Sequence, residues 1–266
     1  MNKISIAIPT YNPSLFLKDL LTSLSKVDFL NEVVINDDNS IKNEYYKTKK
    51  IVTEFTNSSN INISLYKNNK NLGPFRNKFK AVQRCQSDFV YQIDQDNIPN
   101  VRSLNKVLKT TNLLDFKNCL ILPGSIYPFR FDHTKEMKNK KTRIIVSNRN
   151  KILDSKLVAE LSNRNLSQDS ILPYSLSSGN PIVHKHTYLT KLNEAYEDTT
   201  IIADTMATAF YWLKNGGQIY ILKNFSHHLR RHKDSYFTSD PRNKVSSDEI
   251  SRQGSEYYKK IIGSIK

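Results

Sequence analysis

Short apolar runs alternate along the chain with longer stretches whose apolar residues recur at helical spacing. From Leu17 to Leu24 the leucines fall at the i, i+3, i+4 and i+7 positions that line one face of a helix. The runs between such stretches have the length of buried strands. In the first part of the chain we place these strands at 4–8, 32–36, 61–66 and 89–93. Strands that alternate with helices in this way predict a parallel sheet covered by helices.

The second part of the chain continues the pattern with longer polar gaps. Ser246 to Glu249 has the form of a capping box before a terminal helix, which we expect to dock on its own domain. His184 and His186 would alternate across a strand, so we expect no joint metal site from them. Strands are predicted at 119–123, 182–183 and 218–222. Helices are predicted at 101–108 and 157–161, from 201 or 204 to 216, and at 250–262.

Two of the predicted strands end in carboxylates. The run at 89–93 reaches Asp94 and Asp96, and the run at 32–36 is followed by Asp38. In open α/β sheets, ligands bind in the crevice beyond the strand ends, where carboxylates suit a hard cation such as Mg²⁺ or Mn²⁺ on a diphosphate. Taken alone, an Asp-x-Asp pair is also typical of a polar strand end that runs into a turn.

The loops next to these strand ends carry further polar groups. Residues 9–13 follow the first strand with side chains that can hydrogen-bond a ligand. Gly73 permits a turn and Pro74 suits the first position of a helix, so Arg76 falls in the first helical turn. An arginine there can clamp a phosphate or stack on a base, or it is an ordinary surface residue. All of these groups converge on one edge of the predicted sheet.

Four blocks, 6–12, 33–40, 71–77 and 93–97, resemble the family 2 glycosyltransferases in their order and spacing. Together they cover most of the first part of the chain. The resemblance implies the GT-A fold, a Rossmann-like α/β architecture with a mixed, mostly parallel sheet flanked by helices. It implies that this part of the chain binds a nucleotide sugar.

The resemblance also implies roles for single residues of the first half. Arg76 would lie near the base or the diphosphate. Asp94 would contact the ribose or the metal, and Asp96 would bind the metal, Mg²⁺ or Mn²⁺. The residues expected to line the base and ribose are Pro9, Thr10, Tyr11, Asn12 and Asp38.

The second half carries three further parts of the resemblance. Gly179 would let the backbone approach the donor sugar. Asp204 would be the catalytic base, although Ala203 stands where the family has a first acid. Alternatively, Asp204 is a carboxylate in the first turn of a helix that is favoured by the helix dipole alone. His232 would be a third metal ligand, and Arg230 or Arg231 would neutralise the leaving diphosphate. Alternatively, this run is a basic solvated loop.

The composition limits the possible partners. The chain has 266 residues, with 40 Lys and Arg against 25 Asp and Glu and a net charge of +15. Such a charge suits nucleic acid, an anionic membrane surface or a phosphorylated substrate, or it is a solvated face. Much of it lies in 130–151 and 223–244. The spacing of Cys85 and Cys119 is not that of a metal site. Two cysteines would give at most one disulfide in a chain of this size, which favours a reducing compartment.

We therefore expect a glycosyltransferase that moves a sugar from a nucleoside-diphosphate donor to an acceptor hydroxyl by metal-assisted inverting displacement. The acceptor would be a glycan, a lipid-linked molecule or a protein, in surface polysaccharide or glycan synthesis. Residues 1–225 would form the GT-A domain, with a nucleotide-sugar-binding half at 1–100 and an acceptor and catalytic half at 101–225. The basic segment and helix of 226–266 would pack on the same domain.

Three alternatives remain at this point. A nucleotidyltransferase of sugar phosphates usually has a Gly-rich phosphate loop, which residues 9–12 are not. A nucleic-acid-binding protein would use the positive charge, but the chain has no recognisable RNA- or DNA-binding motif. A relative without catalysis would bind the donor and transfer nothing.

Residues 1–8 form too short an apolar run for a signal peptide, so we expect a cytoplasmic protein, with peripheral contact at the inner face of a membrane as an option. The oligomeric state is open.

Overall fold

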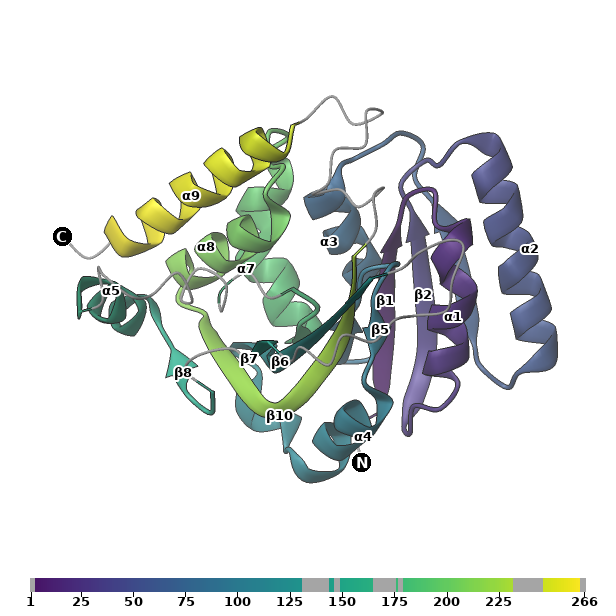
Figure 1. The fold of residues 1–266 in the computed structure, drawn as a ribbon, viewed down its shortest axis with the longest axis horizontal. Coiled ribbons are helices and arrows are strands. Elements are labelled where there is room, and N and C mark those ends of the chain that lie inside the picture. The colour runs from purple at the N-terminus through teal and green to yellow at the C-terminus, as the bar shows by residue number, and fades with distance from the viewer. Residues whose placement is uncertain are drawn as a thin grey trace.

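A mixed sheet with helices on both faces forms the centre of the molecule (Figure 1). The computed structural model describes residues 3–130, 144–145, 149–164, 176, 179–231 and 246–263. Within these residues the sheet has the strand order β3-β2-β1-β4-β9-β6-β10-β5, with β7 beside β6 and β8 beside β10. This is the α/β architecture that the sequence predicted.

The first half of the chain forms a regular β-α-β series. Every strand predicted here is present, and β1 lies between β2 and β4 and is parallel to both. Because the strands are parallel, their carboxyl ends meet at one edge of the sheet. The elements are β1 (Ile4–Thr10), α1 (Ser14–Leu24), β2 (Leu30–Asp37), α2 (Lys42–Ser58), β3 (Ile63–Lys67), α3 (Pro74–Arg84) and β4 (Phe89–Gln92).

The second half joins the first through a short antiparallel strand. This strand, β9 (Ile182–His184), pairs antiparallel with both β4 and β6, whereas β10 is parallel to β6. The remaining elements are β5 (Ile98–Pro99), α4 (Val101–Thr110), the 3-10 helix η1 (Leu113–Phe116), β6 (Cys119–Arg130), β7 (Ile144–Ile145), β8 (Ile152–Leu153), α5 (Ser155–Arg164), α7 (Lys185–Glu197), α8 (Asp204–Lys214), β10 (Gln218–Arg231) and α9 (Ser247–Gly263).

The core lies on both faces of this sheet. Alternation along β1 sends Ile4, Ile6 and Ile8 to the face covered by α1, α2 and α4, while Ala7 points to the face covered by α3, α7, α8 and α9. The predicted leucine stripe of α1 is fully buried on the first of these faces. Because side chains are buried on both faces of the sheet, the strand ends and the polar groups on them have fixed positions.

Two elements differ from the sequence prediction. The strand at 182–183 was expected to continue through His186, but it ends at His184 and the unpredicted helix α7 follows at once. Tyr188, Leu192 and Ala195 are buried at i, i+4 and i+7, a helical stripe that the sequence already contained. The last sheet strand, predicted to end at residue 222, continues as β10 to Arg231.

The C-terminal helix α9 docks on its own domain, as predicted. Ile250, Tyr257 and Ile261 are buried, and the rings of Tyr257 and Phe210 on α8 lie 5.4 Å apart. Ser246 caps the helix, because its Oγ accepts from the N–H of Glu249 at 3.2 Å. Figure 1 shows α9, in yellow, lying along α8. The continuous strand β10 crosses residue 225, so the sheet joins the two sides of that boundary.

Candidate functional site

Strand β4 delivers the two predicted metal ligands. It ends at Gln92, so Asp94 and Asp96 lie just beyond its carboxyl end. The N–H of Asp94 donates to Oδ1 of Asn180 at 2.8 Å, which ties this turn to the segment before β9. The side chain of Asp94 is 30% exposed. A ligand arriving at the edge of the sheet can therefore reach its carboxylate.

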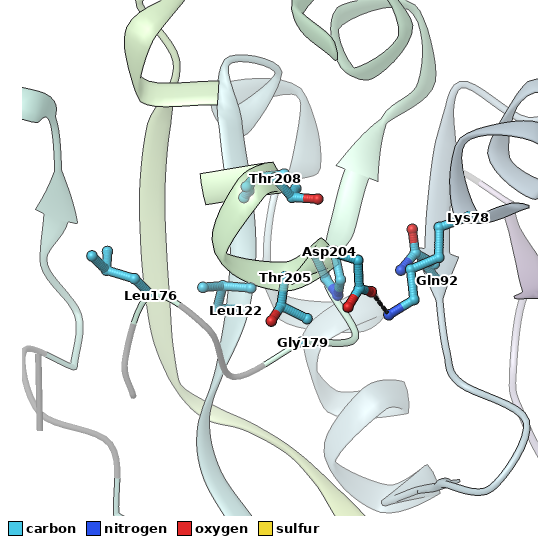
Figure 2. A pocket seen from close by; sticks show the side chains of 10 residues that line it. Lys78, Gln92, Leu122, Leu176, Gly179, Asp204, Thr205 and Thr208 are labelled. Carbon is cyan, nitrogen blue, oxygen red and sulfur yellow. Dashed lines mark ion pairs between the residues drawn. The ribbon is translucent and has the colours of Figure 1, made fainter. Parts of the chain in front are cut away.

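Lys78 on α3 joins this strand end to the predicted base. Its Nζ lies 2.8 Å from Oδ1 of Asp94 and 2.6 Å from Oδ2 of Asp204, and its side chain is only 10% exposed. Figure 2 shows the pair that it makes with Asp204. Burial disfavours the ammonium, but the two carboxylates together outweigh burial and raise the pKa of Lys78 above its usual value. Lys78 stays protonated and holds the two carboxylates beside each other.

Sequence reasoning missed Lys78, although a signal was present. Phe75, Phe79 and Val82 of α3 are buried and fall at i, i+4 and i+7. Lys78 lies at the i+3 position of the same stripe, which faces the core. A lysine at such a position needs acidic partners, because an unpaired buried ammonium is costly. The helical pattern therefore indicated a buried ion pair without naming its partners.

Asp204 opens helix α8, as predicted. It is 3% exposed and is the one acidic residue in the first turn of that helix. The preceding Ala203 occupies the N-cap and supplies no side-chain cap. The helix dipole favours a carboxylate at this end, and the ammonium of Lys78 adds to that stabilisation. Both place positive charge next to the carboxylate of Asp204.

An open pocket with about 330 Å³ of empty space lies beside the Lys78–Asp204 pair. Gly179 forms part of its wall at φ +65°, and a Cβ added there would lie 3.7 Å from Cγ2 of Thr205. The left-handed backbone rather than lack of space is thus what favours glycine at this position. Figure 2 shows the lining residues, which include Gln92, Leu122, Leu176 and Thr208.

Asp38 lies past the end of β2 and is buried. Its carboxylate accepts hydrogen bonds from the N–H groups of Leu72 and Gly73 and from the side-chain amide of Asn68, at 2.8, 2.9 and 2.8 Å. Burial raises its pKa, although these three donors oppose that shift. Asp38 thus holds the loop in which α3 begins, and its expected contact with the base or ribose stays a prediction.

The loop after β1 is tied to both neighbouring strand ends. Gln95 accepts from the N–H of Tyr11 at 2.7 Å and donates to the carbonyl of Tyr11 at 2.9 Å. Asn12, at φ 50°, donates its N–H to Oγ of Ser40 at 2.8 Å. These bonds bring together the loops after β1, β2 and β4. Two further predicted residues are buried at the end of β1, Pro9 and Thr10.

The two predicted arginines differ in how far solvent reaches them. Arg76 lies in the first turn of α3, is partly exposed, and donates from Nε to the carbonyl of Leu72 at 2.9 Å. The side chain of Arg230 is 1% exposed, pairs with Asp19 at 3.2 Å and lies over the ring of Phe16. Arg230 is part of strand β10 and not of a loop. In this conformation its guanidinium is covered, so Arg76 is the arginine better placed to meet a ligand.

Asn180 and His227 were not predicted, and both support the Asp94 turn. Nε2 of His227 lies 3.1 Å from Nδ2 of Asn180, whose Oδ1 accepts from the N–H of Asp94. Burial lowers the pKa of His227 to about 4, so its ring is neutral near pH 7 and its Nε2 can accept from the amide. A buried histidine of β10 thereby fixes the orientation of Asn180.

The third predicted metal ligand, His232, lies outside the described residues, as do 131–143 of the basic segment. In the part of the chain that the structure describes, no three His, Cys, Asp or Glu side chains gather as a metal cluster would. The metal site thus stays a prediction that rests on Asp94 and Asp96. No described helix is long and apolar enough to cross a membrane.

Comparison with known proteins connects the first half of the chain to one family. The model of glycosyl transferase family 2 matches residues 5–116. The poly(ribitol-phosphate) β-N-acetylglucosaminyltransferase TarS of Staphylococcus aureus is 34% identical over 107 residues, which are 39% of this chain and 18% of TarS. The Salmonella typhimurium abequosyltransferase RfbV is 31% identical over 97 residues, 35% of this chain and 28% of the relative.

A Campylobacter jejuni relative has its acceptor in its name. The GalNAc(5)-diNAcBac-PP-undecaprenol β-1,3-glucosyltransferase is 27% identical over 125 residues, 46% of this chain and 39% of that protein. All of these matches cover less than half of each relative. Each of them also covers less than half of this chain, and the family model lies at residues 5–116.

The fold extends the likeness to nearly the whole chain. A crystal structure of S. aureus TarS in complex with UDP-GlcNAc superposes with a TM-score of 0.59 at 19% identity, over 98% of this chain and 71% of that one. A longer TarS structure gives a TM-score of 0.58 over 97% of this chain and 43% of its own. At such identity the match shows the GT-A fold alone. The match to the glycosyl transferase family 2 model over residues 5–116 therefore lies within a chain that has the GT-A fold.

Proposed function

We propose that the protein is a nucleotide-sugar-dependent glycosyltransferase that transfers a sugar to an acceptor hydroxyl by an inverting single displacement. One observation carries the proposal: Lys78 brings Asp94, at a strand end of the nucleotide-binding half, together with the buried Asp204 beside an open pocket. A donor held at the strand ends and a base at the start of α8 would then face the same space. The family match favours this function over nucleotidyl transfer and over nucleic-acid binding.

The donor would be a nucleoside-diphosphate sugar at the edge formed by the loops after β1, β2 and β4. The hydrogen bonds of Gln95 to Tyr11 and of Asp38 to the 72–73 loop preorganise that edge, so little order would have to be gained on binding. A uridine nucleotide is the first to test, because the solved relative was crystallised with UDP-GlcNAc. Arg76 is expected to lie near the base or the diphosphate.

A divalent cation, Mg²⁺ or Mn²⁺, would be held by Asp94 and Asp96. The donor set fits such an ion, because two carboxylates with hard oxygen ligands lie at a partly exposed strand end where phosphate oxygens and waters could complete the shell. The ion would offset the charge of the leaving diphosphate. His232 is a candidate third ligand.

Asp204 would act as the general base. As the acceptor oxygen attacks the anomeric carbon, its proton would pass to the carboxylate of Asp204, and the bond from that carbon to the diphosphate oxygen would break. Lys78 would hold Asp204 against the strand end that carries Asp94. The wall formed by Gly179 and Thr205 lies next to this base and would border the donor sugar.

The acceptor is proposed to be a glycan or lipid-linked glycan of a surface polysaccharide, with a protein as the further option. The names of two relatives contain poly(ribitol-phosphate) and PP-undecaprenol, both of which carry phosphate. The net charge of +15 would suit a phosphate-bearing acceptor or peripheral contact with an anionic membrane surface. Both proposals concern the half of the chain that is least similar in sequence to these relatives.

The direct test of donor binding is a thermal-shift panel of nucleoside diphosphates and their sugars, with and without Mn²⁺, on the wild type and on Asp96→Ala. A ligand that binds only the native state raises the apparent stability. We expect a rise with one nucleotide class that requires metal and is lost in the variant. No rise with any nucleotide would overturn the proposal, and a rise that persists in Asp96→Ala would overturn the metal site.

A further inference from the structure

The C-terminal helix α9 reaches the loop that leads into the proposed base through one side chain, Gln253. Its Oε1 accepts from the N–H groups of both Ile202 and Ala203, each at 2.8 Å. Its Nε2 donates to the carbonyl of Thr200, also at 2.8 Å. One amide thus makes three hydrogen bonds to the four residues that precede Asp204.

These bonds hold the chain just before helix α8, which has no side-chain cap of its own. Its N-cap residue, Ala203, has no side chain that can accept from the first turn, while the carbonyl of Ala203 accepts the first helical bond from Ala207 at 2.9 Å. The path of the chain at 200–203 decides where the helix begins and so where the carboxylate of Asp204 lies. Gln253 holds that path from a segment about fifty residues further along the chain.

The position of α9 does not depend on this glutamine. Ile250 and Tyr257, on either side of it, are 2% and 5% exposed, and Ile261 is 2% exposed. Tyr257 packs against Phe210 and Tyr211 of α8. The apolar contacts that dock α9 therefore remain when the amide of Gln253 is removed, whereas the loop at 200–203 loses three bonds.

We propose that Gln253 is a positioning residue for Asp204, so that α9 belongs to the catalytic unit although it contributes no group to the pocket. The inference rests on the proposed function only in taking Asp204 as the base. It predicts that loss of the amide moves the base without moving the nucleotide-binding edge, because that edge is built from the loops after β1, β2 and β4. The rate constant kcat should fall while the donor KM stays unchanged.

The test compares Gln253→Met, which keeps length and volume but not the amide, with Arg252→Met at the neighbouring exposed position. A base displaced by about 1 Å can cost ~10²-fold in rate, so kcat of Gln253→Met should fall by up to about that factor with an unchanged donor KM. Hydrogen exchange should become faster at the amides of Ile202 and Ala203. Arg252→Met should change neither quantity.

A third variant separates positioning from general loss of stability. Gln253→Glu keeps an oxygen for both N–H groups but sets its second oxygen against the carbonyl of Thr200, so it should recover part of the kcat that Gln253→Met loses. Unchanged exchange in a folded Gln253→Met, or wild-type kcat in that variant while Asp204→Asn is inactive, would overturn the inference. If Gln253→Met does not fold, failure of Gln253→Glu to retain protected amides at Ile202 and Ala203 would overturn it as well. A wild-type rate in Asp204→Asn would instead overturn the base assignment, and with it the proposed mechanism.

Discussion

Two edges of this molecule are assembled in different ways. One is the nucleotide-binding edge, formed by the loops after β1, β2 and β4, and the other holds the proposed general base Asp204 and is called the base edge here. At the first edge, the loops after β1, β2 and β4 bond to one another directly, as Tyr11 does to Gln95 and Asp38 to Leu72. At the second, Asp204 depends on Lys78 from α3 and Gln253 from α9, which lie far away in the sequence and on opposite sides of it. The first edge is a set of adjacent strand ends, whereas the second is a meeting point of helices from both halves of the chain.

This difference has a consequence for how substitutions act. Each bond of the nucleotide edge is backed by the same parallel strands, so the loss of one leaves the others in place. The base edge has one buried cation between two carboxylates, and nothing else in the described residues is an ion-pair partner for Asp204. We therefore expect single changes to be severe at the base edge and mild at the nucleotide edge.

The largest effect expected is that of removing the base. Asp204→Asn keeps the size of the side chain but cannot accept the proton, so kcat should fall ~10²–10⁴-fold. Donor binding, measured by the thermal shift with nucleotide and Mn²⁺, should stay close to that of the wild type. Sugar transfer by Asp204→Asn at the wild-type rate would contradict the assignment of Asp204 as the general base.

Removing the cation between the edges should cost both stability and rate. Lys78→Met leaves Asp204 buried without its counterion, which typically costs roughly 3–5 kcal/mol for a broken buried pair. Denaturant unfolding would measure the loss. Lys80→Met is the matched control on the same helix. Lys80 bonds to the exposed Gln83 and lies over the ring of Tyr196, so its loss should cost far less. Equal losses in the two variants would contradict the central role given to Lys78.

Acid should lower the free energy of unfolding through His227, the residue that supports the turn at Asp94. Burial lowers the pKa of folded His227 from 6.5 to about 4, so as the pH falls from 6.5 the unfolded chain takes up the proton first. The free energy of unfolding should then fall between pH 6.5 and 4, by up to ~3 kcal/mol from this group.

Substitution of the histidine checks this assignment. His227→Gln should flatten the stability profile over the same pH window, when unfolding is followed by denaturant at several pH values. His186→Gln, at an exposed histidine, should leave the profile as it is. A slope that persists in His227→Gln would assign the acid sensitivity to other groups.

The smallest effect expected lies at the nucleotide edge. Gln95→Ala removes two partly buried hydrogen bonds to the backbone of Tyr11, worth ~1–3 kcal/mol together. Donor affinity, measured by titration with the nucleotide that the panel identifies, should weaken by a similar or smaller energy, with kcat little changed. Gln86→Ala, at an exposed glutamine, is the control. A loss of rate as large as that of Asp204→Asn would remove the contrast between the edges.

Most of the first half could be predicted because its signals are local. Each strand from β1 to β4 contains a short, mostly apolar run, and α1 and α3 have one buried stripe each. The elements of the second half were harder to predict from the sequence. Helix α7 begins one residue after β9 with no breaker between them, and β10 continues through the polar residues Lys223 and Asn224, which looked like the start of a loop.

The sequence by itself determined the β-α-β order of the first half, the resemblance to family 2 glycosyltransferases, and the carboxylates that stand at the strand ends and at the start of α8. These features follow from periodicity and from spacing along the chain, which a sequence records directly. Only the tertiary structure decided that Lys78 bridges Asp94 and Asp204, that His227 supports Asn180, and that Gln253 holds the loop before Asp204. A helical or strand pattern shows which side of an element is buried, but packing of distant segments selects the partner that each buried polar group meets there.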